Sequence, residues 1–198
     1  MAIIKNLQTL LIIAINTLSF LSLAISHSHD QYYETSTPKK LGTEKLTHFH
    51  FYLPDVFSGP NATEVRVAGP QVTSNSTSSF GFVAIFDDPM TVGPDPSSKK
   101  IGSAQGLYAS ASQTEPAVLT VLTFVFTEGK FKGSTLSLLG RDAFFSEEIR
   151  EMPIVGGSGA FRFARGYALE KTYMFNTTTL DSIMEYNVYV LHYSSRSK

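Results

Sequence analysis

Residues 117–140, AVLTVLTFVFTEGKFKGSTLSLLG, indicate the fold class of this chain most directly. Two apolar runs flank a polar segment, TEGKFKG at 127–133, that contains two glycines. Glycine tolerates the positive φ angles of tight turns, so the stretch predicts two antiparallel strands joined as a β-hairpin.

Similar short runs occur on both sides of this hairpin, separated by segments rich in turn residues. Residues 45–53, KLTHFHFYL, show the two-residue alternation of a β-strand, in which successive side chains point to opposite faces. No stretch keeps a helical period, so the chain is expected to be all-β, as an antiparallel barrel or sandwich. The remaining predicted strands cover 63–69, 78–88, 103–112, 160–175 and 181–193.

The composition narrows the class of protein. The chain has 198 residues, enough for one domain with a sizeable core, and no internal repeat or linker is evident. It contains no cysteine, which excludes disulfides, thiolate metal sites and cysteine nucleophiles. A net charge of −1 gives no electrostatic reason to expect nucleic acid or an anionic membrane as a partner.

The first 26 residues have the pattern of a secretory signal peptide. Lys5 precedes an apolar run at 10–26, and the small residues Ala24 and Ser26 suit a signal peptidase. A signal anchor is the competing interpretation, which the polar break within the run disfavours. We therefore expect a signal peptide at 1–26, a flexible polar arm at 27–44 and a β-barrel domain at 45–198, secreted to the extracellular space.

Three N-glycosylation sequons agree with secretion. They begin at Asn61, Asn75 and Asn176, each in a polar, turn-like setting. We expect glycans at one or more of these asparagines, which must then face the solvent.

In the stretch REMPIVGGSGAFRFARGYA at 150–168, charged residues are interspersed among apolar residues and glycines. It lacks the spacing of a nucleotide-binding loop and is followed by a strand rather than a helix. Strand alternation places Phe161, Phe163 and Arg165 on one face, so these are candidate substrate-binding residues if that face lines a cavity. A solvated rim is the alternative.

Two other patterns are interpreted as structural. Asp87 and Asp88 are adjacent and would point to opposite faces of a strand, and Asp-Pro commonly marks a turn. His48 and His50 share a face, but no third ligand is evident, so no metal site is expected.

Several long motifs in the same order resemble the plant dirigent protein family, from about His48 to Tyr193. They are FDDPMTVGPDPSSKKIGSAQGLY (86–108), FTEGKFKGSTLSLLGRD (126–142), REMPIVGGSGAFRFARGYA (150–168) and YNVYVLHY (186–193). The chain is most similar to the defence-related branch that includes pterocarpan-forming members. The resemblance implies an eight-stranded antiparallel barrel of the dirigent and allene oxide cyclase kind. It also implies a secreted, apoplastic homo-oligomer, usually a trimer, with a dimer as the alternative.

The resemblance also implies an activity. Dirigent proteins of the lignan type bind phenoxy radicals of monolignols such as coniferyl alcohol, made by a separate laccase or peroxidase, and direct the face on which they couple. No cofactor is then needed. The first alternative is a pterocarpan synthase, a dehydratase-cyclase that acts on an isoflavanol through a quinone methide. The second is a barrel that binds phenolic compounds without chemistry.

The family's polar pocket residues correspond to Asp55, Tyr108, Asp142 and Arg150, which are the candidate catalytic residues. Pro54 stands where the family usually has histidine, and the alternation after AQG gives Tyr108 and then Ser110 where pinoresinol-forming relatives tend to have tyrosines. We expect Arg150 at the mouth of the pocket to pair with Asp142 and to lower the pKa of that carboxyl.

Overall fold

The computed structural model describes Asn6, Asn16 and residues 41–193. The chain divides into two units, 1–39 and 40–198. Within the first, Asn6 and Asn16 are helical; the rest of the predicted signal peptide and residues 27–40 of the predicted arm lie outside the described residues, so both stay predictions. In the part of the chain that the structure describes, no helix is long and apolar enough to span a bilayer.

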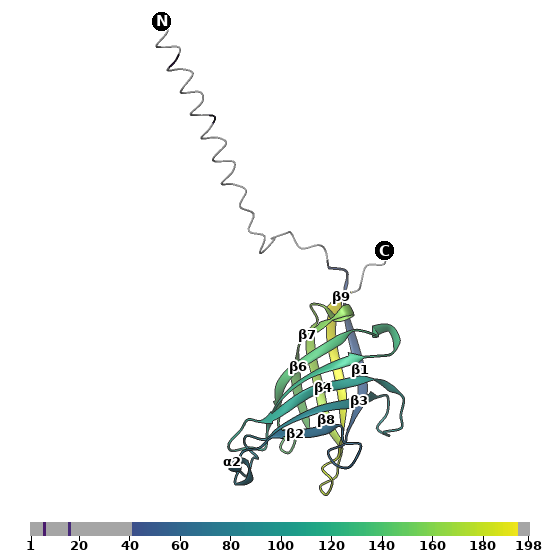
Figure 1. Ribbon diagram of the computed structural model, residues 1–198. Coiled ribbons are helices and arrows are strands. Elements are labelled where there is room, and N and C mark those ends of the chain that lie inside the picture. The colour runs from purple at the N-terminus through teal and green to yellow at the C-terminus, as the bar shows by residue number, and fades with distance from the viewer. Residues whose placement is uncertain (1–5, 7–15, 17–40, 194–198) are drawn as a thin grey trace. The chain divides into compact units, whose positions relative to one another are not determined.

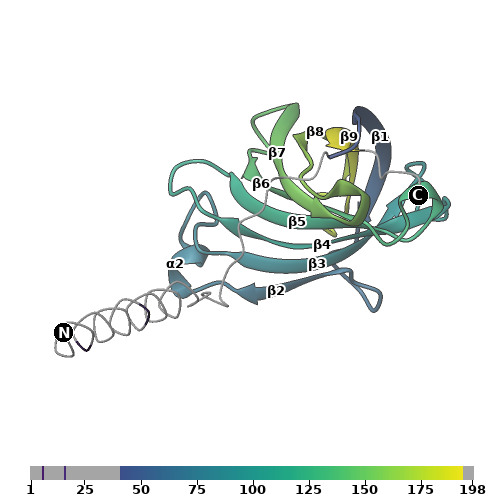
Figure 2. The ribbon, with the colours of Figure 1, turned by 90° about the horizontal axis from the view of Figure 1, so that it is seen from above.

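The second unit is an antiparallel β-barrel (Figures 1 and 2). Besides its strands, the described part contains one turn of helix, α2 (Gln71–Ser74), and two short 3₁₀ turns, η1 (Gly129–Phe131) and η2 (Gly159–Phe161). The strands are β1 (Glu44–Asp55), β2 (Glu64–Ala68), β3 (Val83–Thr91), β4 (Lys100–Ser110), β5 (Val118–Phe126), β6 (Thr135–Asp142), β7 (Ile149–Ser158), β8 (Arg165–Phe175) and β9 (Ser182–Tyr193).

Eight of these strands close the barrel in the order β1-β9-β8-β7-β6-β5-β4-β3. The ring closes where Tyr52 of β1 pairs with Thr91 of β3. The short strand β2 pairs with the other half of the same edge of β3, with Glu64 opposite Phe86. Along this edge, the first half of β3 pairs with β2 and its last residue pairs with β1. Strands β1 and β2 therefore diverge from each other near the end of β1.

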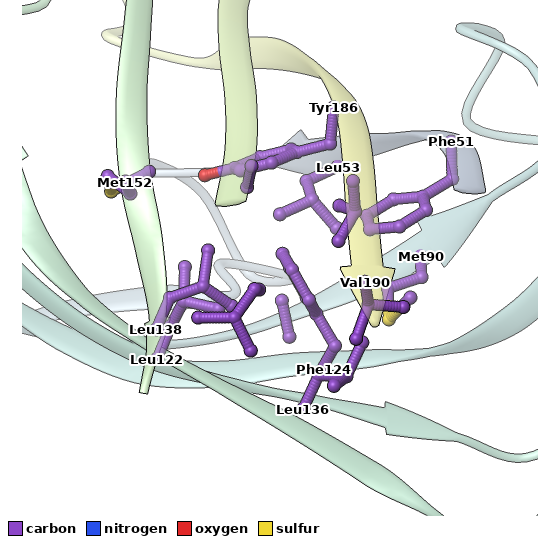
Figure 3. Packing of buried hydrophobic residues seen from close by; sticks show 14 of the residues in the cluster. Phe51, Leu53, Met90, Leu122, Phe124, Leu136, Leu138, Met152, Tyr186 and Val190 are labelled. Carbon is purple, nitrogen blue, oxygen red and sulfur yellow. The ribbon is translucent and has the colours of Figure 1, made fainter. Parts of the chain in front are cut away.

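Strand alternation decides which side chains fill the barrel. In β5, every second residue from Val118 to Phe126 is buried, as the sequence of the hairpin predicts. The inner side chains form one core, in which Phe51, Phe124 and Tyr186 contact one another through their rings (Figure 3). Apolar burial of this extent supplies the main stabilisation of a domain without disulfides.

The interior is packed at one end and open at the other. Four phenylalanines close the packed end by ring contacts, Phe49, Phe126, Phe131 and Phe161. Gly106 of β4 allows close packing, because a Cβ atom there would lie 2.4 Å from the carbonyl oxygen of Val121 and 2.8 Å from the Phe86 ring. Beyond Phe86, toward the open end, the interior widens into a cavity.

The structure corrects the sequence reading of 149–175. Residues 149–158, for which no strand is expected from the sequence, form strand β7, with Arg150, Met152 and Ile154 pointing inward. The turn comes later, at 159–164, where η2 and a positive φ of 63° at Phe163 interrupt the alternation. Strand β8 therefore begins only at Arg165.

The outer face of β2–β6 carries a row of exposed apolar side chains. Neighbours in the row are paired across adjacent strands, and each is at least one-third exposed. An exposed apolar patch of this kind is typical of interaction surfaces. The homo-oligomer expected from the sequence stays a prediction. The row consists of Val65, Ile85, Leu107, Val121 and Leu139.

Candidate active site

A cavity of about 440 Å³ occupies the open end of the barrel. Its walls are mainly apolar, and polar side chains reach it from two halves of the strand ring. Such a cavity suits an aromatic small molecule oriented by a few polar groups. The aromatic rings that line it, apart from tyrosines, are Phe57, Phe82, Phe86, Phe144, Phe145 and Phe175.

Three carboxyl groups meet on the β1–β4 half of the cavity: Asp55 at the end of β1, Glu64 at the start of β2 and Asp88 in β3. We call these three residues the acid cluster. The Tyr108 hydroxyl donates a hydrogen bond to Glu64 Oε1, and the Thr63 hydroxyl donates to Asp88 Oδ1 over 2.6 Å. Among the residues that the structure describes, no cationic side chain forms an ion pair with the acid cluster.

Burial without a cation makes these carboxyls weak acids. The pKa of Asp55 rises to about 9, first because the group is buried and then because Asp88 and Glu64 lie beside it. Burial raises the pKa of Asp88 to about 7, although the hydrogen bond from Thr63 opposes the shift. Burial also raises the pKa of Glu64. At neutral pH the acid cluster therefore holds a proton, on Asp55, that it can donate.

A second group of polar residues lies on the β6–β9 half. Arg150 Nε donates to Asp142 Oδ1 over 2.9 Å, and Arg150 Nη2 donates to Glu170 Oε1 over 2.8 Å. The Tyr186 hydroxyl donates to the other Glu170 oxygen over 2.7 Å. We call Asp142, Arg150, Glu170 and Tyr186 the arginine cluster; the guanidinium satisfies two buried carboxylates at once.

The expected ion pair between Arg150 and Asp142 is present, but the expected fall in the pKa of Asp142 is wrong. Burial and the nearby Glu170 carboxylate raise the pKa of Asp142 to about 7, against the opposing effect of Arg150. Burial lowers the pKa of Arg150, but the two carboxylates outweigh it and raise the pKa further, so the guanidinium stays charged. One positive charge shared with a second carboxylate is too little to lower the pKa of Asp142 in this buried site.

Comparison with known proteins identifies the family of this barrel. The model of the family described as dirigent-like protein matches residues 46–191. The chain belongs to the dirigent family. It is 49% identical over 179 residues to pterocarpan synthase 1 of Glycyrrhiza echinata, covering 89% of this chain and 94% of that protein. It is 52% identical over 149 residues to dirigent protein 21 of Arabidopsis thaliana, covering 75% and 78%.

Solved structures of the dirigent family share the fold. The pterocarpan synthase dirigent protein GePTS1 superposes with a TM-score of 0.74 at 48% identity, covering 84% of this chain and 92% of that one. The pterocarpan synthase dirigent protein PsPTS1 gives a TM-score of 0.71, also at 48% identity, covering 76% and 97%. The eight-stranded antiparallel barrel predicted from the sequence is confirmed.

Three of the four candidate catalytic residues of this dirigent protein line the cavity: Asp55, Tyr108 and Asp142. Arg150 does not reach the mouth, because its side chain is 1% exposed and lies behind the two carboxylates it binds. It is therefore placed to position Asp142 and not to touch a substrate. Ser110 also lines the cavity, as its alternation with Tyr108 predicts.

The candidate substrate-binding residues lie away from this cavity. Phe161 is fully buried at the packed end, and Phe163 is 64% exposed on the turn before β8. Arg165 is exposed and pairs with Glu44 Oε1 over 2.7 Å. The turn at 159–164 removed them from the alternation on which their assignment rested, and the structure offers no support for a role at this site.

Sequence reasoning missed four polar residues of the site: Glu64, Asp88, Glu170 and Tyr186. Asp88 was read as part of an Asp-Pro turn, yet Pro89 lies within β3, where Asp87 faces outward and Asp88 inward. Alternation gave no signal for Glu64, because it shares its face of the strand with Arg66, whereas Val65 and Val67 on the apolar face are exposed in the structure.

The structure also shows where the sequon asparagines and the two histidines of the first strand lie. The sequon asparagines Asn61, Asn75 and Asn176 are all exposed, and their glycosylation stays a prediction. His50 Nε2 lies 2.6 Å from Glu185 Oε1, and the His48 ring stacks on Tyr189. Within the described ranges, no group of three or more metal-ligating side chains forms a metal site.

Proposed function

We propose that this dirigent protein is a dehydratase-cyclase that converts a phenolic alcohol of the isoflavanol type into a pterocarpan through a quinone methide. The observation that carries the proposal is one apolar cavity with two buried carboxyls: Asp55 on one half, whose raised pKa keeps it protonated at neutral pH, and Asp142 on the other half, which is held by Arg150. The similarity to proteins named pterocarpan synthase supports the same reaction class. Secretion to the apoplast is part of the proposal.

The first half of the reaction expels water. Asp55 donates its proton to the leaving hydroxyl, the carbon–oxygen bond breaks, and water departs. The phenol conjugated with that carbon gives its proton to the Asp142 carboxylate, which leaves a neutral quinone methide. Arg150 holds Asp142 by a charge-assisted hydrogen bond and fixes its position near the phenol.

The second half closes the ring and restores both carboxyls. A second phenol oxygen of the same molecule attacks the methide carbon, and its proton passes to the Asp55 carboxylate. The quinone oxygen recovers a proton from Asp142. The net change is the loss of one water molecule, without oxidation, and the walls of the cavity select the face of attack.

The test is whether product forms without an oxidase. The purified protein with an isoflavanol should release a pterocarpan of one handedness, followed by chiral chromatography. Asp55→Asn should slow the reaction about 100-fold or more, because the proton donor is lost. Asp87→Asn is the matched control: Asp87 faces outward, where its carboxylate accepts a bond from Gln105 Nε2 over 3.3 Å, and the rate should stay near that of the wild type.

A second candidate function is stereoselective coupling of monolignol radicals supplied by a laccase or peroxidase. It is favoured by the presence of polar groups on two halves of the cavity, because each could orient one phenol ring. A changed enantiomeric ratio that requires laccase, with no turnover of an isoflavanol, would support this function over the first. If both assays fail, a barrel that only binds phenolic compounds is the remaining interpretation.

A further inference from the structure

We propose that Glu64 is a positioning residue that keeps Asp55 protonated: the two carboxyl groups share one proton, which resides on Asp55. The inference deepens the proposed function, because it names the group that makes Asp55 an acid. It applies to the protein without substrate as well, so it is testable even if the reaction proposed above is wrong.

The fold brings the two carboxyls together. Asp55 ends β1, Glu64 begins β2, and the loop between them is tied by backbone bonds from Thr63 N and Glu64 N to Val56 O, of 2.8 Å and 3.3 Å. The Asp55 and Glu64 carboxyls lie within hydrogen-bonding reach of each other. Two carboxylates cannot form such a bond, so one of the two must carry a proton.

Hydrogen bonding decides which carboxyl keeps the proton. Glu64 is 4% exposed and accepts a bond from the Tyr108 hydroxyl, which stabilises its ionised form. Asp55 receives only a long bond, 3.4 Å, from the Ser182 hydroxyl to Oδ2, and Oδ1 is buried without an N–H or O–H donor among the described residues. A protonated Asp55 avoids an unpaired buried charge and becomes the donor to Glu64.

The surroundings reinforce this assignment. The other ionisable groups near the pair are Asp88 from β3 and Tyr108 from β4, both without positive charge. Arg150, which is the one buried arginine or lysine among the residues that the structure describes, lies on the other half of the barrel and is already bound by Asp142 and Glu170. Glu64 also raises the pKa of Asp55 through its charge and its hydrogen bond.

The experiment follows Asp55 directly in the substrate-free protein by NMR, with ¹³C in the aspartate carboxyls and Asp55→Asn to assign the signal. In the wild type, the Asp55 signal should stay in its protonated position through neutral pH and change near pH 9. Glu64→Gln removes the neighbouring charge and can donate an amide hydrogen to Asp55, so the change should occur at a pH at least one unit lower.

Three further variants separate positioning from a general structural effect. Glu151→Gln, at an exposed position of β7, is the matched control and should leave the Asp55 titration unchanged. Glu64→Asp keeps the charge and should keep the alkaline titration. Tyr108→Phe removes the donor to Glu64, so the shared proton should move toward Glu64 and the Asp55 signal toward its ionised position at neutral pH.

The result that overturns the proposal is an Asp55 titration that is the same in the wild type and in folded Glu64→Gln. If Glu64→Gln does not fold, an unchanged Asp55 signal in Tyr108→Phe overturns it equally. A shifted titration in a protein that turns over no isoflavanol would support the carboxyl pair and reject only the proposed function.

Discussion

The acid cluster and the arginine cluster place the same chemical group in the same cavity under different electrostatic conditions. Asp55 has two acidic neighbours, Asp88 and Glu64, and a pKa of about 9, whereas Asp142 has Glu170 and Glu147 but also Arg150 beside it, and a pKa of about 7. Burial raises the pKa of both aspartates, and a cation, Arg150, opposes this rise only at Asp142. Neutral pH lies at the point where Asp55 is protonated and Asp142 is partly ionised, and the fold thereby separates an acid from a base.

The largest expected effect comes from removing the one cation of the arginine cluster. Arg150→Leu leaves Asp142 and Glu170 buried without a positive charge, which should cost roughly 3–5 kcal/mol of folding stability and lower the melting temperature by roughly 10 °C. Arg141→Leu is the control, because Arg141 also binds two carboxylates, Glu115 and Glu147, but on the exposed surface.

Calorimetry of the two variants tests the contrast between buried and exposed arginines. Arg141→Leu should lose much less stability than Arg150→Leu, since solvent screens exposed ion pairs. Equal losses in the two variants would mean that the guanidinium of Arg150 is not essential to the arginine cluster, and that Asp142 and Glu170 are stabilised by protonation instead.

The barrel could be predicted from the sequence because strand alternation and turn residues are local features of the chain. Alternation and turn residues identified most strands and, with the family motifs, the closed barrel. The sequence also brought Asp142 and Arg150 together, since both flank one loop. It failed at Phe161, Phe163 and Arg165, because a positive φ at Phe163 is a property of the folded turn. It missed Glu64, because the convergence of β1, β2 and β3 depends on contacts distant in the chain.

A smaller effect should appear in the dependence of the rate on pH. Glu170→Gln removes a negative charge that raises the pKa of Asp142, so this pKa should fall below about 7. The base then ionises at lower pH, and the acidic limb of kcat/KM should move down by roughly one unit. Tyr186 keeps a partner, because its hydroxyl can accept a bond from the new amide.

Glu64→Gln should act on the opposite limb of the same profile. Both substitutions lower the pKa of an aspartate, but lowering that of Asp55 removes the acid, whereas lowering that of Asp142 preserves the base. Glu64→Gln should therefore narrow the pH range of activity and Glu170→Gln should widen it. If both variants narrowed the pH range, or both widened it, the acid and base roles would not be divided between the clusters as proposed.

The smallest effect concerns the dependence of stability on pH, and it differs in size between the two clusters. The folded-state pKa of Asp55, about 9, lies above its unfolded value near 3.9, so the stability that its proton contributes is complete below about pH 4 and is lost as pH rises toward 9. Asp55→Asn cannot ionise, so above neutral pH it should melt a few degrees higher than the wild type, with little difference at pH 4.

Asp142→Asn should show the same trend over a narrower pH range, because the folded-state pKa of Asp142, about 7, also lies above its unfolded value but by less. Its gain over the wild type between pH 4 and pH 8 should therefore be smaller than that of Asp55→Asn, since Arg150 stabilises the Asp142 carboxylate. Melting curves of the two Asp→Asn variants at pH 4 and pH 8 are sufficient. If Asp55→Asn melts below the wild type at pH 8, Asp55 is stabilised there as a carboxylate, and the distinction between the two clusters does not hold.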